Sequence, residues 1–308
     1  MRLIFIATGD IALPSFRYLL EHGPRPLALV TQPDKPVGRH QTLTPPAIKV
    51  VALAAGITVH QPETIGDAFA ELHALDPEVL VVMAYGQILR KEILNLATQA
   101  IINLHASILP KYRGAACIQA AIAAGDLETG ITAMHVVREL DAGDIILIKT
   151  LAIAADETGG GLHDRLGLLA AEVLAEVIVN FTDGTAGRVP QDDRISSYIP
   201  KLERDDGRLD WTQDAATIER RIRAYEPWPG TFTVIREDGR EKRLKIFPPT
   251  QVVESTLPAG EFHQSSEGKL LIGCGTQALL IEWVQPEGSR RMSAEDYLRG
   301  RKRGVTGH

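Results

Sequence analysis

The sequence predicts an α/β protein in two parts, a parallel sheet covered by helices and then a small antiparallel domain. In the first half, near-continuous apolar runs alternate with helical patterns, as in parallel strands that are buried on both faces. After about residue 190, short apolar segments follow one another with turn residues and no helices between them. The predicted fold class is therefore α/β: a Rossmann-like, doubly wound, mainly parallel sheet, followed by a small OB-like β-barrel.

Four apolar runs in the first half are the predicted parallel strands, at residues 3–7, 27–31, 78–83 and 100–104. A helical pattern at residues 13–21 follows the first of them. A second helix is expected to begin at Pro45 and Pro46 and to run through Ala55. Proline suits the first turn of a helix, because its missing N–H would have no partner there. Residues 158–181 are predicted to form the closing helix of this domain.

A change in composition near Pro190 predicts the domain boundary. Charged residues with few apolar ones fill 191–194 and 201–208, which indicates a linker. Beyond it we expect a helix at 215–224 and strands at 231–235, 244–247, 269–272 and 278–283. The predicted organisation is a first domain at 1–189, a linker at 190–206 and a second domain at 207–308.

The bulk composition excludes several classes of protein. The chain has 308 residues, of which 44% are hydrophobic and 23% are charged, as in ordinary soluble globular proteins. The N-terminal apolar run ends before Gly9, too early for a signal peptide, and no run reaches the length of a membrane helix. We therefore expect a cytoplasmic protein with no membrane partner. The two cysteines and the unpaired spacing of the nine histidines predict no disulfide framework and no metal site.

The formal net charge of -6 argues at first against a nucleic-acid partner, since proteins that bind nucleic acids usually have a basic total. The acidic excess is unevenly distributed along the chain, however. Residues 1–204 carry 17 Lys and Arg against 23 Asp and Glu, whereas residues 205–308 carry 16 against 16. The C-terminal end is locally basic, with Arg290, Arg291, Arg299, Arg301, Lys302 and Arg303. Local basic patches therefore keep a nucleic-acid partner possible.

The most informative stretch starts where the fourth predicted strand ends, at Asn103-Leu104-His105-Ala106-Ser107-Ile108-Leu109-Pro110. In open α/β sheets, ligands bind outside the carboxyl ends of the strands. Asn103 and His105 are two residues apart on a strand, so their side chains point to the same side. An amide and an imidazole placed together there could donate hydrogen bonds to a developing oxyanion. The alternative is that both side chains merely cap a junction between a strand and a loop.

A second stretch, Asp141-Ala142-Gly143-Asp144, lies between two runs with β-propensity, at 131–137 and 145–148. On its own this pattern is typical of a hairpin turn. The functional interpretation is that Asp141 faces His105, where it would fix the tautomer of the imidazole or raise its basicity.

Together the two stretches resemble the folate-dependent formyltransferases, through Asn-x-His-x-Ser-x-Leu-Pro-x-x-Arg-Gly and the Asp-x-Gly-Asp that follows. The resemblance extends over most of the chain. It implies a catalytic first domain in which Asn103, His105 and Asp141 are the catalytic residues and 10-formyltetrahydrofolate is the co-substrate, with no metal required. It also implies folate-binding positions, namely Met83, Tyr85, Gly86, Ser107, Ile108, Leu109, Pro110 and Leu140.

Three further segments narrow the resemblance to members of the family that formylate methionyl initiator tRNA. They are the loop at 32–39, the Gly130-Ile131-Thr132 segment, and the second-domain segments Asp210-Trp211 and 220–230. This resemblance implies a tRNA-binding second domain and a tRNA contact at Arg39. Arg220 and Arg223, on the predicted helix, are further candidate tRNA contacts, with a solvated helix face as the alternative.

Two other functions stay open at this point. A formyltransferase that acts on a small amine, such as an amino sugar or a ribonucleotide, would share Asn103, His105 and Asp141. A non-catalytic protein that binds nucleic acid through its OB-like domain would not need these three residues.

Overall fold

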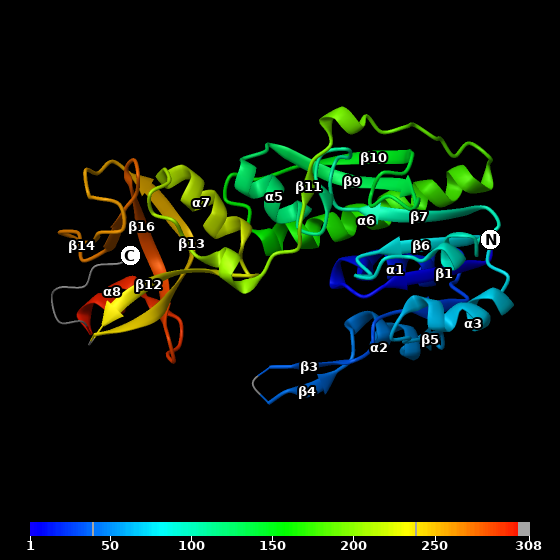
Figure 1. Cartoon of the computed structure of the whole chain (residues 1–308), viewed down its shortest axis with the longest axis horizontal. Coiled ribbons are helices and arrows are strands. Elements are labelled where there is room, and N and C mark those ends of the chain that lie inside the picture. The colour runs from blue at the N-terminus through cyan, green and yellow to red at the C-terminus, as the bar shows by residue number, and fades with distance from the viewer. Residues whose placement is uncertain (39, 238, 301–308) are drawn as a thin grey trace. The chain divides into compact units, whose positions relative to one another are not determined.

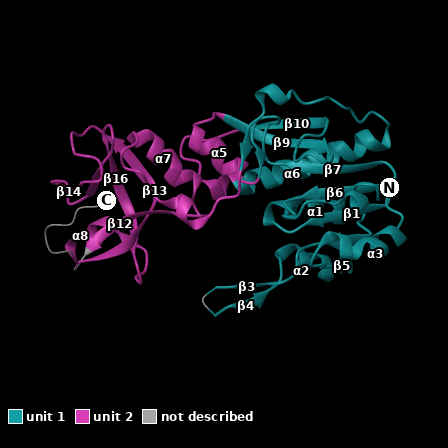
Figure 2. Cartoon of the chain, in the orientation of Figure 1, with its two compact units in different colours: residues 1–114, 128–151, 163–199 teal, residues 115–127, 152–162, 200–308 magenta. Residues whose placement is uncertain are grey.

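The computed structural model describes residues 1–38, 40–237 and 239–300. The chain forms two compact units, each built from segments that are far apart in the sequence (Figure 2). Unit 1 comprises Met1–Gly114, Glu128–Leu151 and His163–Ile199, and unit 2 comprises Ala115–Leu127, Ala152–Leu162 and Pro200–His308. Two short segments from within residues 1–189, namely Ala115–Leu127 and Ala152–Leu162, therefore belong to unit 2. The boundaries expected at 189 and 207 follow chain order and stay a prediction.

Unit 1 contains a seven-stranded sheet in the order β10-β9-β7-β6-β1-β2-β5 (Figure 1). Its strands are β1 (Leu3–Ala7), β2 (Ala28–Val30), β5 (Thr58–His60), β6 (Val79–Met83), β7 (Ala100–His105), β9 (Glu128–His135) and β10 (Ile145–Ala152). The strands β7, β6, β1, β2 and β5 are parallel to one another, whereas β9 is antiparallel to β7. β1 and β6 are buried at every position. The predicted α/β fold class is confirmed.

The helices of this part of the chain place their apolar faces against the sheet. They are α1 (Leu13–Glu21), α2 (Ala47–Ala54), α3 (Phe69–Ala74), α4 (Lys91–Leu94) and α6 (Gly159–Thr182), with short 3-10 turns η1 (Asp10–Ala12) and η2 (Ile65–Ala68). In α6, Leu166, Ala170 and Val177 are fully buried at helical spacing. Gly167 allows a close approach, because a Cβ there would lie 3.1 Å from the Ile11 carbonyl oxygen.

A two-stranded hairpin projects from unit 1 (Figure 1). Its strands are β3 (Lys35–Val37) and β4 (Thr42–Thr44), and both are exposed along their length. Arg39, the predicted tRNA contact, lies outside the described residues.

Unit 2 contains an antiparallel sheet in the order β12-β13-β16-β15-β14, with β17 paired to β16. Its strands are β12 (Thr231–Glu237), β13 (Arg240–Val253), β14 (Phe262–Gln264), β15 (Leu270–Gly273), β16 (Ala278–Pro286) and β17 (Met292–Ser293). The helices of this unit are α5 (Cys117–Ala124), α7 (Ala215–Ala224) and α8 (Ala294–Arg299), with the 3-10 turn η4 (Arg204–Gly207). One apolar core joins α7, α8 and the sheet, through residues such as Ile218, Leu244 and Tyr297. The antiparallel strands expected for this region are present, together with the helix predicted at 215–224.

Residues 189–199, of which 190–199 fall in the predicted linker, are part of unit 1. Val189 forms a β-bridge with Ile145. After the 3-10 turn η3 (Asp193–Ile195), β11 (Tyr198–Ile199) pairs in parallel with β8 (Arg113–Gly114). Polar side chains do not prevent this pairing, because the hydrogen bonds of a ladder join backbone groups.

Candidate active site

The site lies at the carboxyl end of β7, where Asn103 and His105 project to the same side of the strand. Asn103 is partly buried and His105 is buried. β7 lies beside β6, so the segment that follows β6 emerges at the same edge of the sheet. This edge is where doubly wound sheets bind their ligands.

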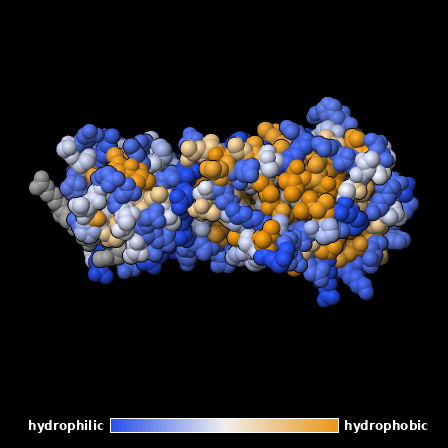
Figure 3. All heavy atoms as spheres, turned by 90° about the horizontal axis from the view of Figure 1, so that it is seen from above, coloured by the Kyte–Doolittle hydropathy of each residue, from blue (hydrophilic) through white to orange (hydrophobic). Residues whose placement is uncertain are grey.

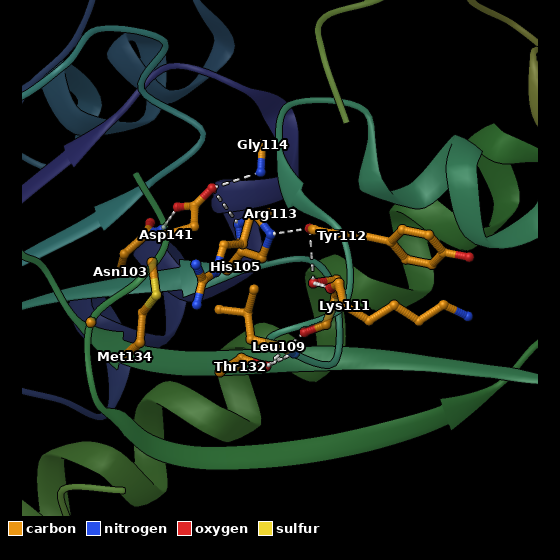
Figure 4. Close-up of polar contacts among 12 residues, drawn as sticks. Asn103, His105, Leu109, Lys111, Tyr112, Arg113, Gly114, Thr132, Met134 and Asp141 are labelled. Atoms are coloured by element: carbon orange, nitrogen blue, oxygen red, sulfur yellow. Dashed lines mark hydrogen bonds and ion pairs between the residues drawn. The ribbon is translucent and has the colours of Figure 1, made fainter. Parts of the chain in front are cut away.

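Asp141 joins this pair from the connection between β9 and β10 (Figure 4). The Asn103 amide nitrogen donates a hydrogen bond of 3.3 Å to its Oδ1 atom, and the Gly114 backbone N–H donates one of 2.9 Å to Oδ2. The Nδ1 atom of His105 lies 3.7 Å from Oδ2. The structure thus brings Asn103, His105 and Asp141 together in space, although Asp141 lies 36 positions after His105 in the sequence.

The position of one proton on His105 follows from its second contact. The Nε2 atom lies 2.9 Å from the Tyr112 carbonyl oxygen (Figure 4). A carbonyl oxygen can only accept a hydrogen bond, so Nε2 carries a proton. The other ring nitrogen, Nδ1, faces the Asp141 carboxylate. Asp141 therefore faces the ring nitrogen that carries no hydrogen in the neutral imidazole.

The loop after β7 is held from β9 by one hydroxyl group. Thr132 Oγ1 donates a hydrogen bond of 2.7 Å to the Ser107 carbonyl and accepts one of 3.1 Å from the Leu109 N–H. The Ser107 hydroxyl donates to the carbonyl of Lys111, at 2.8 Å. Ser107 and Leu109 are buried, whereas Ile108 and Pro110 stay partly exposed. Ile108 and Pro110 are thus the members of this predicted folate segment whose side chains reach the surface.

The predicted folate positions after β6 likewise include both buried and exposed residues. Met83 and Tyr85 are 1% and 2% exposed, so their side chains belong to the core, and Gly86 is exposed. Burial raises the pKa of Tyr85 to about 12, which keeps its hydroxyl neutral. Its backbone carbonyl accepts hydrogen bonds from the Thr8 hydroxyl at 3.2 Å and from the Gln32 amide at 2.7 Å. The ends of β1, β2 and β6 are therefore tied together at this edge.

Leu140, the last predicted folate position, is 52% exposed and precedes Asp141. An exposed leucine beside buried polar groups offers an apolar surface to a flat ring. Gly86 offers backbone groups without a side chain at the same edge of the sheet.

Arg220 and Arg223, the candidate tRNA contacts on α7, make contacts inside unit 2. Arg223 binds the Glu219 carboxylate through Nε and Nη2, at 2.5 and 3.0 Å, and the Glu157 carbonyl through Nη1. Arg220 donates to the Ala123 carbonyl at 3.3 Å. Both guanidinium groups thus hold α7 to neighbouring segments of its own unit, and a tRNA contact at either position stays a prediction.

Tyr112, Thr132 and Gln191 hold the site but are not among the residues expected from the sequence. Tyr112 acts through a backbone carbonyl, and such a contact leaves no trace in the sequence. Thr132 stands in an apolar strand as an ordinary β-branched residue. Gln191 donates hydrogen bonds to two carbonyls of the Asp141 loop, yet it lies in the charged stretch that predicts a linker.

The described residues contain no group of three or more His, Cys, Asp and Glu side chains that could hold a metal ion. In the same part of the chain, every helix is too short or too polar to cross a membrane.

Comparisons with known families account for both halves of the chain. Residues 15–178 match the family described as Formyl transferase, and residues 201–302 match the family described as Formyl transferase, C-terminal domain. Among solved structures, the fold is similar to HypX from Aquifex aeolicus in complex with tetrahydrofolic acid. That match has a TM-score of 0.65 and 19% identity, and covers 97% of this chain and 47% of that one. An N-formyltransferase from Helicobacter canadensis, in complex with folinic acid and dTDP-3-aminofucose, gives a TM-score of 0.66 at 18% identity, with 93% and 99% coverage.

Curated relatives are much more similar in sequence. The methionyl-tRNA formyltransferase of Akkermansia muciniphila is 50% identical over 304 residues, which cover 97% of this chain and 96% of that protein. The methionyl-tRNA formyltransferase of Caldanaerobacter subterraneus is 43% identical, with 97% of each chain covered. Identity of this extent over both units, together with the two family matches, shows that the chain belongs to the formyl transferase family, among the methionyl-tRNA formyltransferases.

Proposed function

We propose that this protein transfers the formyl group of 10-formyltetrahydrofolate to the amino group of methionyl initiator tRNA, giving N-formylmethionyl-tRNA and tetrahydrofolate. The observation that carries the proposal is the cluster of Asn103, His105 and Asp141 at the carboxyl end of β7. The 50% identity to a methionyl-tRNA formyltransferase supports the choice of acceptor. Because aminoacyl-tRNA is used by the ribosome, we also propose that the protein works in the cytoplasm.

The cluster fits the charges that develop in this reaction. The amine attacks the formyl carbon, so a C–N bond forms and the carbonyl oxygen becomes an oxyanion. The Asn103 amide has two N–H groups, of which one binds Asp141, and the other can stabilise the oxyanion. His105 can add a second donor when its Nε2–H turns from the Tyr112 carbonyl to the oxyanion. Each such donor contributes about 100- to 1,000-fold to the rate in comparable enzymes.

Two proton movements complete the transfer. The attacking nitrogen must lose a proton, and the folate nitrogen must gain one as its bond to the formyl carbon breaks. His105 and Asp141 form a connected pair, with the carboxylate facing Nδ1, that can take up the first proton and deliver the second. No covalent intermediate on the protein is required by this scheme.

The folate co-substrate fits the exposed groups at the same edge of the sheet. Ile108, Pro110 and Leu140 offer partly or fully exposed apolar side chains, and Gly86 offers its backbone. We expect Met83 and Tyr85 to contribute through their backbone groups, since both side chains are buried.

An RNA acceptor is favoured over a small amine by a surface of unit 2. Phe247 and Trp283 are paired across β13 and β16, and the Arg291 guanidinium lies 4.4 Å and 5.4 Å from their ring centroids. Trp283 is 38% exposed, and Lys245 is exposed on the same face two residues from Phe247. Aromatic rings and cations placed together suit RNA, because bases stack on the rings and phosphates bind the cations. We name these four residues the aromatic–basic face.

The test is a transfer assay with 10-formyltetrahydrofolate and three acceptors: methionyl initiator tRNA, methionyl elongator tRNA and a small amine such as an amino sugar. We expect formylmethionine to form fastest with the initiator tRNA. His105→Ala should lower kcat at least 100-fold in a protein that still folds, because it removes both a donor and a proton carrier. His263→Ala, at an exposed position of β14, is the matched control. Faster transfer to the small amine would overturn the acceptor, and a near-native His105→Ala enzyme would overturn the catalytic roles.

A further inference from the structure

One side chain outside the catalytic cluster holds the backbone of Asp141 directly. The Gln191 amide nitrogen donates hydrogen bonds to the carbonyl oxygens of Asp141, at 2.9 Å, and of Gly143, at 2.8 Å. An amide nitrogen has two N–H groups, and here each has a carbonyl to bind. Gln191 therefore fixes both ends of the turn from which the Asp141 carboxylate projects.

The orientation of the Gln191 amide is set by the contacts of its oxygen atom. The Gln191 Oε1 atom accepts hydrogen bonds from Arg113 Nε, at 3.1 Å, and from Nη2, at 2.8 Å. Because guanidinium nitrogens only donate, the oxygen must face Arg113 and the nitrogen must face the turn. Arg113 is mostly buried, with 13% of its side chain exposed, and is paired with Asp193 at 2.7 Å. The amide thus has one orientation.

The turn needs these hydrogen bonds because its backbone adopts a conformation that is uncommon for a residue with a side chain. Asp141 has a φ of 52°, in the left-handed region, which aspartate adopts more readily than most residues with a side chain but less readily than glycine. At Gly143 a Cβ would overlap the carbonyl oxygen of His135, so the turn is pressed closely against β9. Strained residues of this kind persist where surrounding contacts determine their conformation.

We propose that Gln191 is a positioning residue for the Asp141 carboxylate in the formyl transfer reaction. It acts through two hydrogen bonds to the backbone of the turn, with Arg113 orienting its amide. This inference rests on the proposed function, because it assigns Gln191 a part in the same reaction. The neighbouring residue of β8, Gly114, binds the Asp141 carboxylate itself. The 113–114 segment therefore holds Asp141 along two routes, one to the side chain and one, through Gln191, to the backbone.

The substitution that tests this inference is Gln191→Glu. Glutamate has the size of glutamine and can still accept from Arg113, but it places an oxygen against two carbonyl oxygens where two N–H groups had been. We expect the turn to shift and kcat to fall about 10- to 100-fold, as small misplacements of catalytic groups do. The KM values for folate and tRNA should change less than about threefold, because most of the exposed folate positions, Gly86, Ile108 and Pro110, lie on other loops. Gln264→Glu, at an exposed position of β14, is the matched control.

A double-mutant cycle separates positioning from a general structural role. If Gln191 acts through Asp141, then Gln191→Glu should have no further effect on kcat in an Asp141→Ala protein. A structural residue would lower kcat by the same factor in both backgrounds. Should Gln191→Glu fail to fold, Gln191→Met removes the two donors without adding a charge and enters the same cycle.

The outcomes are distinct. Near-native kcat in Gln191→Glu, or equal factors in the two backgrounds, overturns the inference while leaving the proposed function intact. Failure of the unsubstituted protein to formylate methionyl initiator tRNA overturns the proposed function instead. A loss of kcat that disappears in the Asp141→Ala background supports the positioning role.

Discussion

Asp141 shows how one side chain is held by partners from three parts of the chain. Its carboxylate accepts hydrogen bonds from Asn103 on β7 and from the backbone of Gly114 on β8, and its carbonyl accepts one from Gln191. A carboxylate with several fixed donors has little freedom to rotate. A group that must meet a substrate within a few tenths of an ångström benefits from such restraint.

His135, at the end of β9, is a buried histidine that the proposed reaction does not use. It is 6% exposed, and its Nε2 atom is among the buried atoms for which the described residues supply no hydrogen-bond partner. Burial, and after it the positive charge of Arg188, lowers the pKa of His135 below its usual 6.5. The folded protein therefore takes up this proton less readily than the unfolded chain does.

We predict that this histidine makes the fold sensitive to acid. Below pH 6.5, His135 binds a proton in the unfolded chain but stays neutral in the folded protein until the pH reaches its lowered pKa. The free energy of unfolding therefore falls as the pH drops from 6.5 towards that lowered pKa. His135→Gln, which stays neutral, should lose less stability than the unsubstituted protein between pH 7.5 and 5.5. Urea unfolding at both pH values measures the difference. His263→Gln should behave like the unsubstituted protein, and an equal acid loss in His135→Gln would contradict the prediction.

At the scale of elements, the pairing of β7 with β9 does more than extend the sheet. The register places His105 opposite Thr132, so β9 runs beside β7 and the loop that follows it. Thr132 links the two through hydrogen bonds to the Ser107 carbonyl and the Leu109 N–H. The buried Thr132 hydroxyl thus takes the place of the backbone hydrogen bonds between β7 and β9 at the point where β7 ends and its loop leaves the sheet.

We predict that Thr132→Val destabilises the fold by about 2–3 kcal/mol, because valine keeps the shape of threonine but leaves two buried backbone groups without a partner. Thr44→Val is the matched control, since the exposed Thr44 hydroxyl also donates to a carbonyl, that of Thr42. Its effect should stay within about 0.5 kcal/mol. Denaturant unfolding of both variants at one pH measures the two values. Equal losses of unfolding free energy in the two variants would show that the Thr132 hydrogen bonds to the loop after β7 stabilise the fold no more than those of an exposed threonine.

The 189–199 segment is a second element that supports the site, through its backbone and through the side chains of Gln191 and Ser197. Its β11 strand pairs with β8, and the Ser197 hydroxyl accepts a hydrogen bond from the Tyr112 N–H at 2.9 Å. The carbonyl of Tyr112 is the group that binds His105. The segment therefore supports both His105 and Asp141, although neither its charge nor its hydropathy distinguishes it from a linker.

At the scale of the whole molecule, the two units present different surfaces. Apolar side chains gather on unit 1, at the right of Figure 3, whereas unit 2 is mostly hydrophilic on that side. The acidic excess of the chain lies in residues 1–204, and residues 205–308 are neutral overall. A net charge of -6 is therefore compatible with an RNA partner that binds a local basic surface.

We predict that the aromatic–basic face contributes to tRNA binding. Arg291→Ala should raise the KM for tRNA about 5- to 10-fold, as the loss of a phosphate contact or of a stacking partner does. The fall of kcat/KM with rising salt should also become shallower, because one counterion fewer is released on binding. Transfer kinetics at several salt concentrations measure both effects.

Arg236→Ala is the matched control, because Arg236 is an exposed arginine of the same unit that is paired with Glu241. It should leave the KM and the salt dependence unchanged. An Arg291→Ala enzyme with the tRNA kinetics of this control would exclude the face as a tRNA contact. The KM for folate should be the same in both variants.

The sequence by itself determined the fold class, most of the element positions and the identity of the catalytic candidates. Apolar runs predict buried strands because only a sheet covered on both faces hides every side chain of a strand, and β1 and β6 are indeed fully buried. Asn103 and His105 could be paired from the sequence because a strand alternates its side chains with a period of two. The family followed from motifs whose residues lie close together in the chain.

Tertiary structure alone decided how Asp141 meets His105, and which residues hold them. The contacts of Tyr112 and Gln191 involve a backbone carbonyl and an ordinary glutamine, which meet the site from other parts of the chain. Every residue has a backbone N–H or carbonyl to offer, so such contacts leave no pattern in the sequence. The burial of Tyr85 likewise follows from the direction in which its loop leaves β6. Side-chain periodicity can be read from a sequence, whereas the meeting of distant backbone segments depends on how the whole chain packs.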